Sequence, residues 1–164
     1  EGLKMGIYAK EINGTINYTL VNKGTSTLGD WVNNFQQPFG WSDDMIDSIK
    51  EAKKFVESPP GTNITFVGHS KGGAEAAANA VATNQDAILF NPASVNLEAY
   101  GLNRESYNED MTAYIVKGEI LNNIFGGMST PIDEMKYLPT QEGGSIDNHM
   151  MEAVINALEE KGYQ

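Results

Sequence analysis

The chain has 164 residues, of which 40% are hydrophobic and 20% charged, as is usual for a folded globular domain. A formal net charge of −11 argues against a nucleic-acid-binding protein, which needs a basic surface, and against unaided attraction to an anionic membrane. Since the chain has no cysteine, a disulfide framework and a thiolate zinc site are both excluded. No repeat, linker or membrane-spanning run interrupts the sequence, so we expect a single domain over residues 1–164. No signal-peptide pattern opens the chain and its compartment is not fixed, although an extracellular location is favoured.

The first predicted elements are two strands, over residues 5–9 and 16–21. They flank Asn13-Gly14, a dipeptide typical of tight β-hairpin turns. A short helix is then expected within residues 30–39, and a longer helix with one apolar face over residues 42–56.

The rest of the chain alternates between buried strands and helices. We predict strands at 64–67, 87–90 and 112–117, helices at 71–82 and 148–160, and mostly loop over the Gly-, Pro-, Ser- and Asn-rich residues 122–147. This order predicts an α/β fold of three layers, with a mainly parallel sheet covered by helices on both faces. Ligands of such sheets bind at the carboxyl ends of the strands.

The segment Gly68-His69-Ser70-Lys71-Gly72 fits the pattern G-x-S-x-G between a predicted strand and a predicted helix. Small residues on both sides permit a very tight turn, which would expose Ser70 as a nucleophile. The helix amino terminus would also favour negative charge at this turn. The competing interpretation is that Ser70 is an ordinary helix cap.

A serine nucleophile needs a base, and the chain has two histidines. His69 is adjacent to Ser70, and neighbouring side chains on a tight turn diverge, so we expect it to pack beside the turn. His149 follows a Gly-rich loop at the start of the last predicted helix and is the preferred base. The alternative for His149 is a surface position near a helix end.

The acid that orients the histidine should follow a strand's carboxyl end. Glu119 directly follows the strand predicted at 112–117, which makes it the first candidate. The resulting chain order of Ser70, Glu119 and His149 is that of α/β-hydrolases. Asp133 is the second candidate and Glu98 a distant third, and each could equally be a solvated carboxylate.

Acyl chemistry also needs donors for the oxyanion that forms on the substrate. One is expected to be the backbone N–H of Lys71, the residue after the nucleophile. Thr25, in a loop that follows the strand at 16–21, could supply the second through its N–H and its hydroxyl.

Four segments together resemble the class 3 lipases, a branch of the α/β-hydrolases: "LVNKGTSTLGDWVNN" (20–34), "ITFVGHSKGGAEAAANA" (64–80), "YIVKGEILN" (114–122) and "DNHMMEAVINAL" (147–158). The resemblance implies Ser70 as nucleophile, His149 as base, and Thr25 with Lys71 as the oxyanion hole. The acid of the family usually falls where Glu119 stands. The implied activity is hydrolysis of carboxylic esters such as acylglycerols, phospholipids or short soluble esters, without metal or organic cofactor.

The chain also differs from these lipases. Lys23, Lys71 and Glu119 stand where the family usually has Arg, Leu and Asp, and little sequence remains for a lid. The apolar run from Ile120 to Met128 could line an acyl-chain pocket or form a buried segment that covers the core.

The expected partner is an ester or lipid substrate, with transient lipid contact, and the sequence does not indicate an oligomeric state. Two alternatives to hydrolysis stay open. One is an acyltransferase that uses the same three residues, and the other is a non-catalytic binding module that keeps the fold.

Overall fold

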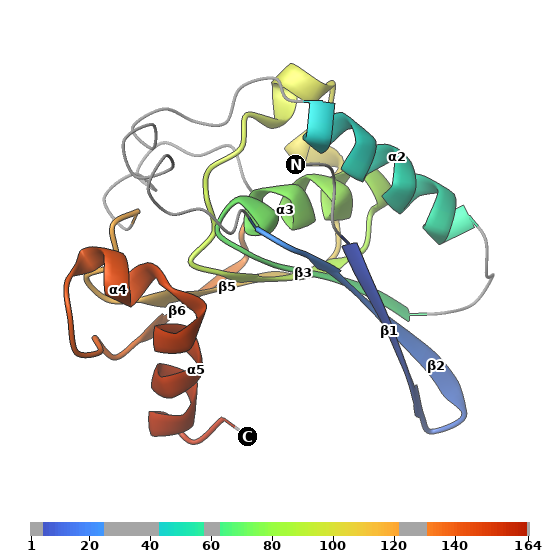
Figure 1. Cartoon of the computed structure of the whole chain (residues 1–164). Helices are drawn as coiled ribbons and strands as arrows, with labels where there is room; N and C mark the ends of the chain where they lie inside the picture. Colours follow the sequence, from blue (N-terminus) through green and yellow to red (C-terminus); the bar gives the residue numbers. More distant parts are fainter. Residues whose placement is uncertain (1–4, 25–42, 58–62, 122–130, 164) are drawn as a thin grey trace.

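The protein is described here as a computed structural model that covers residues 5–24, 43–57, 63–121 and 131–163 (Figure 1). The short helix predicted within residues 30–39 lies outside the described residues. Among the described residues, no helix is both long and apolar enough to cross a bilayer.

A six-stranded sheet in the order β1-β2-β3-β4-β5-β6 forms the centre of the fold. Only β1 and β2 pair antiparallel, and every later neighbour pairs parallel, so the prediction of a mainly parallel sheet is confirmed. The strands are β1 (Met5–Ile12), β2 (Thr15–Asn22), β3 (Asn63–His69), β4 (Asp86–Phe90), β5 (Met111–Val116) and β6 (Glu134–Leu138).

The hairpin of β1 and β2 turns at the predicted dipeptide. Asn13 and Gly14 have φ values of 52° and 80°, and Ile12 pairs with Thr15. Both central residues of a type I′ turn need positive φ, which Asn and Gly tolerate best. The local sequence therefore fixes the register of this hairpin.

Helices cover both faces of the sheet (Figure 1). On one face α3 (Lys71–Thr83) lies against β2, β3 and β4, and α2 (Asp43–Glu57) packs on α3. On the other face α5 (Met151–Glu160) contacts β5 and β6. Alternate side chains of β5 divide between two apolar clusters: Ile115 belongs to the larger one and Val116 to the smaller one beneath α5.

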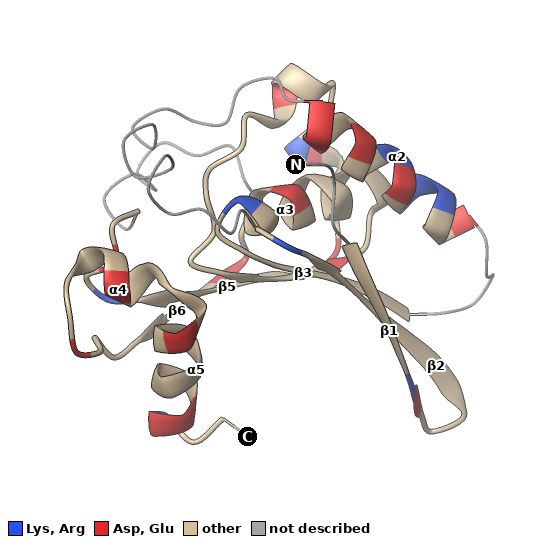
Figure 2. Ribbon diagram, viewed as in Figure 1, with Lys and Arg blue, Asp and Glu red and all other residues tan. Residues whose placement is uncertain are grey.

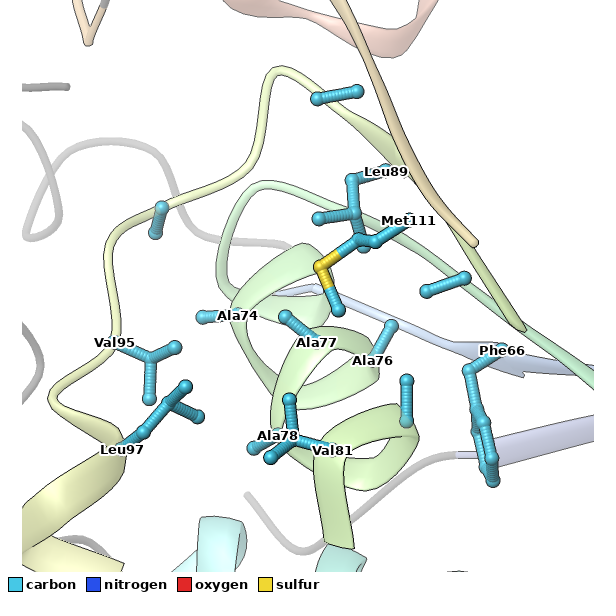
Figure 3. Packing of buried hydrophobic residues seen from close by; sticks show 14 of the residues in the cluster. Phe66, Ala74, Ala76, Ala77, Ala78, Val81, Leu89, Val95, Leu97 and Met111 are labelled. Atoms are coloured by element: carbon cyan, nitrogen blue, oxygen red, sulfur yellow. The ribbon is translucent and has the colours of Figure 1, made fainter. Parts of the chain in front are cut away.

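The larger core depends on the small side chains of α3. Figure 3 shows Ala76 and Ala77 of this helix beside side chains from the sheet, such as Leu89 and Met111. All four of these side chains are almost completely buried. Because alanine adds little bulk, the helix can lie close to the strands and hold its amino terminus against the sheet edge.

The prediction that residues 122–147 are mostly loop missed two elements within the part that the structure describes. Residues Glu134–Leu138 form β6, the last strand of the sheet, and Ser145–His149 form the helix α4. As an edge strand with exposed Met135 and Tyr137, β6 does not show the continuous apolar run of a central strand. The flanking Pro and Gly residues concealed it further.

The last predicted helix is in fact two helices. α4 ends at His149, Met150 adopts an extended conformation with ψ of 151°, and α5 begins at Met151. Two short 3₁₀ helices, Leu97–Tyr100 and Arg104–Ser106, complete the described structure. The break at Met150 places His149 at the junction of two helices. The orientation of the His149 side chain is therefore set by α4 and not by α5.

Candidate active site

Ser70 lies between the end of β3 and the start of α3, in a conformation that non-glycine residues rarely adopt. Its φ and ψ are 58° and −124°. The turn is tight enough that a Cβ atom at Gly68 would overlap the carbonyl of Gly72. A Cβ atom at Gly72 would in turn overlap the carbonyl of Asn22. The small residues on both sides of Ser70 are therefore required by packing.

The helix-cap interpretation of Ser70 is not supported by its contacts. The Ser70 side chain makes no capping hydrogen bond to α3. Its carbonyl oxygen accepts hydrogen bonds from the N–H groups of Gly73, Ala74 and Ala93 at 2.9–3.2 Å. The backbone of this residue is thus held in a strained conformation by its surroundings, as is common at functional sites.

His149 and Glu119 form a buried pair at the carboxyl end of β5. Nδ1 of His149 lies 2.7 Å from Oε2 of Glu119, and the side chains are 1% and 0% exposed. A carboxylate can only accept here, so Nδ1 carries a proton that it donates to Glu119, and Nε2 is the ring nitrogen left to act as a base. This is the tautomer that a general base needs.

The loop after β5 fixes the Glu119 carboxylate. Gly118 has a φ of 83°, which favours glycine and turns the chain back toward the sheet edge. Oε2 of Glu119 also accepts a hydrogen bond from the Leu121 N–H at 2.9 Å, and the N–H of Ile120 donates to the Ser145 carbonyl. These bonds tie the acid loop to the start of the helix that carries His149.

His69 contacts His149 directly, which is more than the packing role expected for it. Nε2 of His69 donates to the His149 carbonyl at 2.6 Å, and the two rings lie 5.0 Å apart between centroids. Burial lowers the pKa of His69 to about 4, against the opposing effect of its hydrogen bond to the His149 carbonyl. A neutral His69 therefore joins the residue next to Ser70 to the backbone of His149.

Asn91 holds the same backbone and was not identified from the sequence. It is fully buried at the end of β4, with a φ of 38°. Nδ2 donates to the carbonyls of Asn148 and His149 at 3.0 and 3.1 Å, and Oδ1 accepts from the Val116 N–H at 2.8 Å. One side chain thus joins the ends of two strands to the histidine. An Asn-Pro pair after a buried strand was the only local signal.

The other candidate acids lie elsewhere. Oδ2 of Asp133 accepts from the N–H of Met111, the first residue of β5, so Asp133 is at the opposite end of that strand from Glu119. Glu98 lies in the first 3₁₀ helix. Of the three, only Glu119 is brought to His149 in the described structure.

Of the two candidate oxyanion donors, only Lys71 lies among the described residues. Thr25 lies outside the described residues. Lys71 is the first residue of α3, and its Nζ is 2.9 Å from Oδ2 of Asp44, so the side chain extends toward α2 and leaves only its N–H at the turn. Within the described part of the chain no group of three or more His, Asp or Glu side chains could hold a metal ion.

Solved structures show which known fold this arrangement matches. The chain superposes on a deletion mutant of the Rhizomucor miehei lipase–propeptide complex (TM-score 0.53, 15% identity, 92% of this chain and 64% of that one). It also superposes on a triacylglycerol lipase of Penicillium expansum (TM-score 0.52, 16% identity, 89% and 74%). A predicted CIB-like hydrolase of Thermoplasma acidophilum matches over 99% of both chains (TM-score 0.51, 11% identity). The chain has the α/β-hydrolase fold of lipases, as the sequence resemblance implied.

Sequence comparison gives a consistent result. An extracellular phospholipase A1 of Serratia liquefaciens is 35% identical over 103 residues, which are 63% of this chain and 30% of the relative. The chain thus spans less than a third of that protein. The family of Tle-like phospholipase domains matches residues 1–161. The chain belongs to the Tle-like phospholipase domain family.

Proposed function

We propose that the protein is a serine hydrolase that cleaves carboxylic esters of lipids, phospholipids among them, through Ser70, His149 and Glu119. The observation that carries this proposal is the buried 2.7 Å contact between His149 and Glu119, beside the strained turn of Ser70. Contacts of His149 with His69, the neighbour of Ser70, support the placement of the base. Family membership supports the class of substrate.

In the proposed reaction, Oγ of Ser70 attacks the ester carbonyl while Nε2 of His149 takes its proton. In the imidazolium that forms, Nδ1 keeps its proton and donates it in a hydrogen bond to Glu119, whose negative charge stabilises the imidazolium in a buried site. His149 then gives the Ser70 proton to the leaving alcohol, and an acyl-enzyme remains. A water molecule, deprotonated by the same nitrogen, attacks the acyl group. The bond to Oγ breaks, the acid leaves, and His149 returns the proton to Oγ of Ser70.

Negative charge develops on the substrate oxygen in both steps. The N–H of Lys71 at the amino terminus of α3 and the N–H and hydroxyl of Thr25 are the proposed donors to it. Each donor of this kind contributes roughly 100- to 1000-fold to the rate in hydrolases that have been mutated.

The phospholipid substrate and an extracellular site of action are proposed by analogy with the Serratia relative, whose name gives both. The net charge of −11 favours contact with zwitterionic or neutral lipid surfaces over anionic ones.

The test is hydrolysis of p-nitrophenyl esters of increasing acyl-chain length and of a diacyl phosphatidylcholine, by wild type and by Ser70→Ala. We expect turnover in the wild type and a loss of at least about 1000-fold in Ser70→Ala, whose thermal stability should be preserved. The preferred chain length distinguishes an esterase from a lipase. Ester products formed with an added alcohol, at the expense of hydrolysis, would indicate an acyltransferase. A folded wild type without any turnover would indicate a binding module and would contradict the proposal.

A further inference from the structure

A cluster of buried polar side chains lies beside the Ser70 turn and takes no part in the chemistry described above. It consists of Asn22 at the end of β2, Ser48 of α2, and Glu75 and Asn79 of α3, each at most 3% exposed. Asn22 Nδ2 donates to Glu75 Oε2 at 3.2 Å and to Ser48 Oγ at 2.9 Å. Asn79 Nδ2 donates to Asn22 Oδ1 and Ser48 Oγ at 3.2 and 2.8 Å. Three elements are thus linked through Asn22.

The backbone that follows Asn22 lies against the nucleophile turn. A Cβ atom at Gly24 would come within 2.8 Å of the His69 carbonyl oxygen and 3.8 Å of the Ser70 Cβ. A Cβ atom at Gly72 would be 2.8 Å from the Gly24 nitrogen. Segment 22–24 is therefore in close contact with the start of α3. The next residue is Thr25, the proposed second oxyanion donor.

Glu75 is the ionisable member of the cluster. Lys71 Nζ lies 3.8 Å from Glu75 Oε1 but 2.9 Å from Asp44 Oδ2, so Lys71 pairs more closely with Asp44. Figure 2 shows that α2, which carries Asp44, contains both acidic and basic residues. Burial raises the pKa of Glu75 to about 7, against the opposing effect of Lys71. Burial of an ionisable carboxyl group in the core is energetically costly, so packing alone does not account for a glutamate at position 75.

We propose that Glu75 is a positioning residue for ester hydrolysis, which acts through the Asn22 amide to hold segment 22–24 against the Ser70 turn. This inference rests on the proposed function. Asn22 Nδ2 donates to Glu75 Oε2 and Ser48 Oγ, and Asn22 Oδ1 accepts from Asn79 Nδ2, so the Asn22 amide has only one orientation in which its donors and its acceptor are all satisfied. Loss of that orientation would free the segment, and misplacement of a reacting group by about 1 Å costs roughly 100-fold in rate.

Two substitutions of Glu75 separate positioning from packing. Glu75→Gln keeps the size of the side chain and an oxygen that can accept from Asn22. Glu75→Leu has a similar volume but no acceptor. Tyr107→Phe is the matched control for stability, because its hydroxyl donates to the Gln85 and Asp110 carbonyls near the amino ends of β4 and β5, away from Ser70.

The measurements are kcat and KM on a p-nitrophenyl ester, and hydrogen exchange of the backbone amides in segment 20–24. We expect Glu75→Leu to lower kcat by roughly 30- to 300-fold with KM within about threefold, and to speed exchange in this segment at least about tenfold. Glu75→Gln should stay within about threefold of wild type on both measures, and Tyr107→Phe should leave kcat unchanged.

The inference is overturned if Glu75→Leu retains kcat within about threefold, or if exchange in segment 20–24 does not change. A failure of the proposed function looks different, because wild type itself would then lack turnover. The catalytic part of the inference would fail with it, and the exchange data would still decide whether Glu75 holds segment 22–24.

Discussion

Nδ1 of His149 lies 2.7 Å from Oε2 of Glu119, and both side chains are buried almost completely. The pair joins the loop after β5 to the last residue of α4, and its two members are 30 residues apart in the chain. Removing one member of a buried pair leaves the other without its partner, which is costly in a medium of low dielectric constant. The contact therefore fixes both the tautomer and the direction of the imidazole.

The first prediction concerns the acid. Glu119→Gln keeps the shape of the side chain but removes the charge that stabilises the imidazolium, so kcat should fall by roughly 100-fold or more. The loss should be smaller than that of Ser70→Ala. Asp133→Asn is the control: Asp133 accepts from Met111 at the other end of β5, and kcat should remain within about twofold. Ester hydrolysis measures both variants, and wild-type activity in Glu119→Gln with a loss in Asp133→Asn would assign the acid to Asp133.

The second prediction concerns Asn91. Asn91→Asp keeps the acceptor for the Val116 N–H but replaces the donor to the Asn148 and His149 carbonyls with an oxygen atom. We expect the free energy of unfolding to fall by about 2–4 kcal/mol and kcat to fall at least about tenfold. The Asn148 carbonyl loses its side-chain donor, the His149 carbonyl keeps only His69, and a carboxylate oxygen then faces both carbonyls. Asn91→Gly, which suits the positive φ, separates the backbone contribution from that of the side chain. Full activity of Asn91→Asp would show that Asn91 does not position His149.

The third prediction concerns stability below neutral pH. Because the pKa of His69 is lowered from 6.5 to about 4 in the folded protein, the unfolded chain takes up a proton between these values before the folded protein does. His69 thus lowers the stability of the protein as pH falls from 6.5 to 4, by up to about 3 kcal/mol. His69→Gln, which can still donate to the His149 carbonyl, should lack this dependence. Urea unfolding of both proteins between pH 4 and 7.5 measures it, and parallel profiles would contradict burial of a neutral His69.

The fourth prediction concerns Glu75, whose effect on stability changes with pH in the opposite direction to that of His69. The pKa of Glu75 is raised from 4.5 to about 7, so the folded protein keeps a proton that the unfolded chain has released. Glu75 therefore lowers stability as pH rises from 4.5 to 7, by up to about 3 kcal/mol, and the effect is absent below 4.5. Glu75→Gln should be more stable than wild type at pH 8 and similar at pH 4. Since the Glu75 and His69 effects oppose each other between pH 4.5 and 6.5, each single variant should show a slope that wild type partly hides. An equal difference between wild type and Glu75→Gln at both pH values would refute the raised pKa.

The elements that could be predicted from the sequence are those that local sequence patterns determine. The hairpin at Asn13-Gly14, the strand before Ser70 and the alanine-rich helix after it all follow from turn chemistry and apolar periodicity, and the structure has them within a few residues. The edge strand β6 was missed because one exposed face and flanking Pro and Gly residues removed its apolar signal.

In the candidate site, too, some features could be predicted from local sequence patterns and others could not. The rule that ligands bind at the carboxyl ends of parallel strands led to Glu119, which the structure does bring to His149. The supporting contacts could not be found in this way. Asn91 and His149 are 58 residues apart and Asn22 and Glu75 are 53 apart, so these pairs exist only once the sheet and helices have assembled.

The most direct test of the central claim is to locate a covalent adduct. Wild type is treated with a fluorophosphonate and digested, and the modified peptide is identified by mass spectrometry, beside Ser70→Ala and His149→Ala. A single adduct on Ser70, absent in Ser70→Ala and formed much more slowly in His149→Ala, is the result that a nucleophile activated by His149 predicts. No adduct, or an adduct on another residue of a folded wild type, would contradict it.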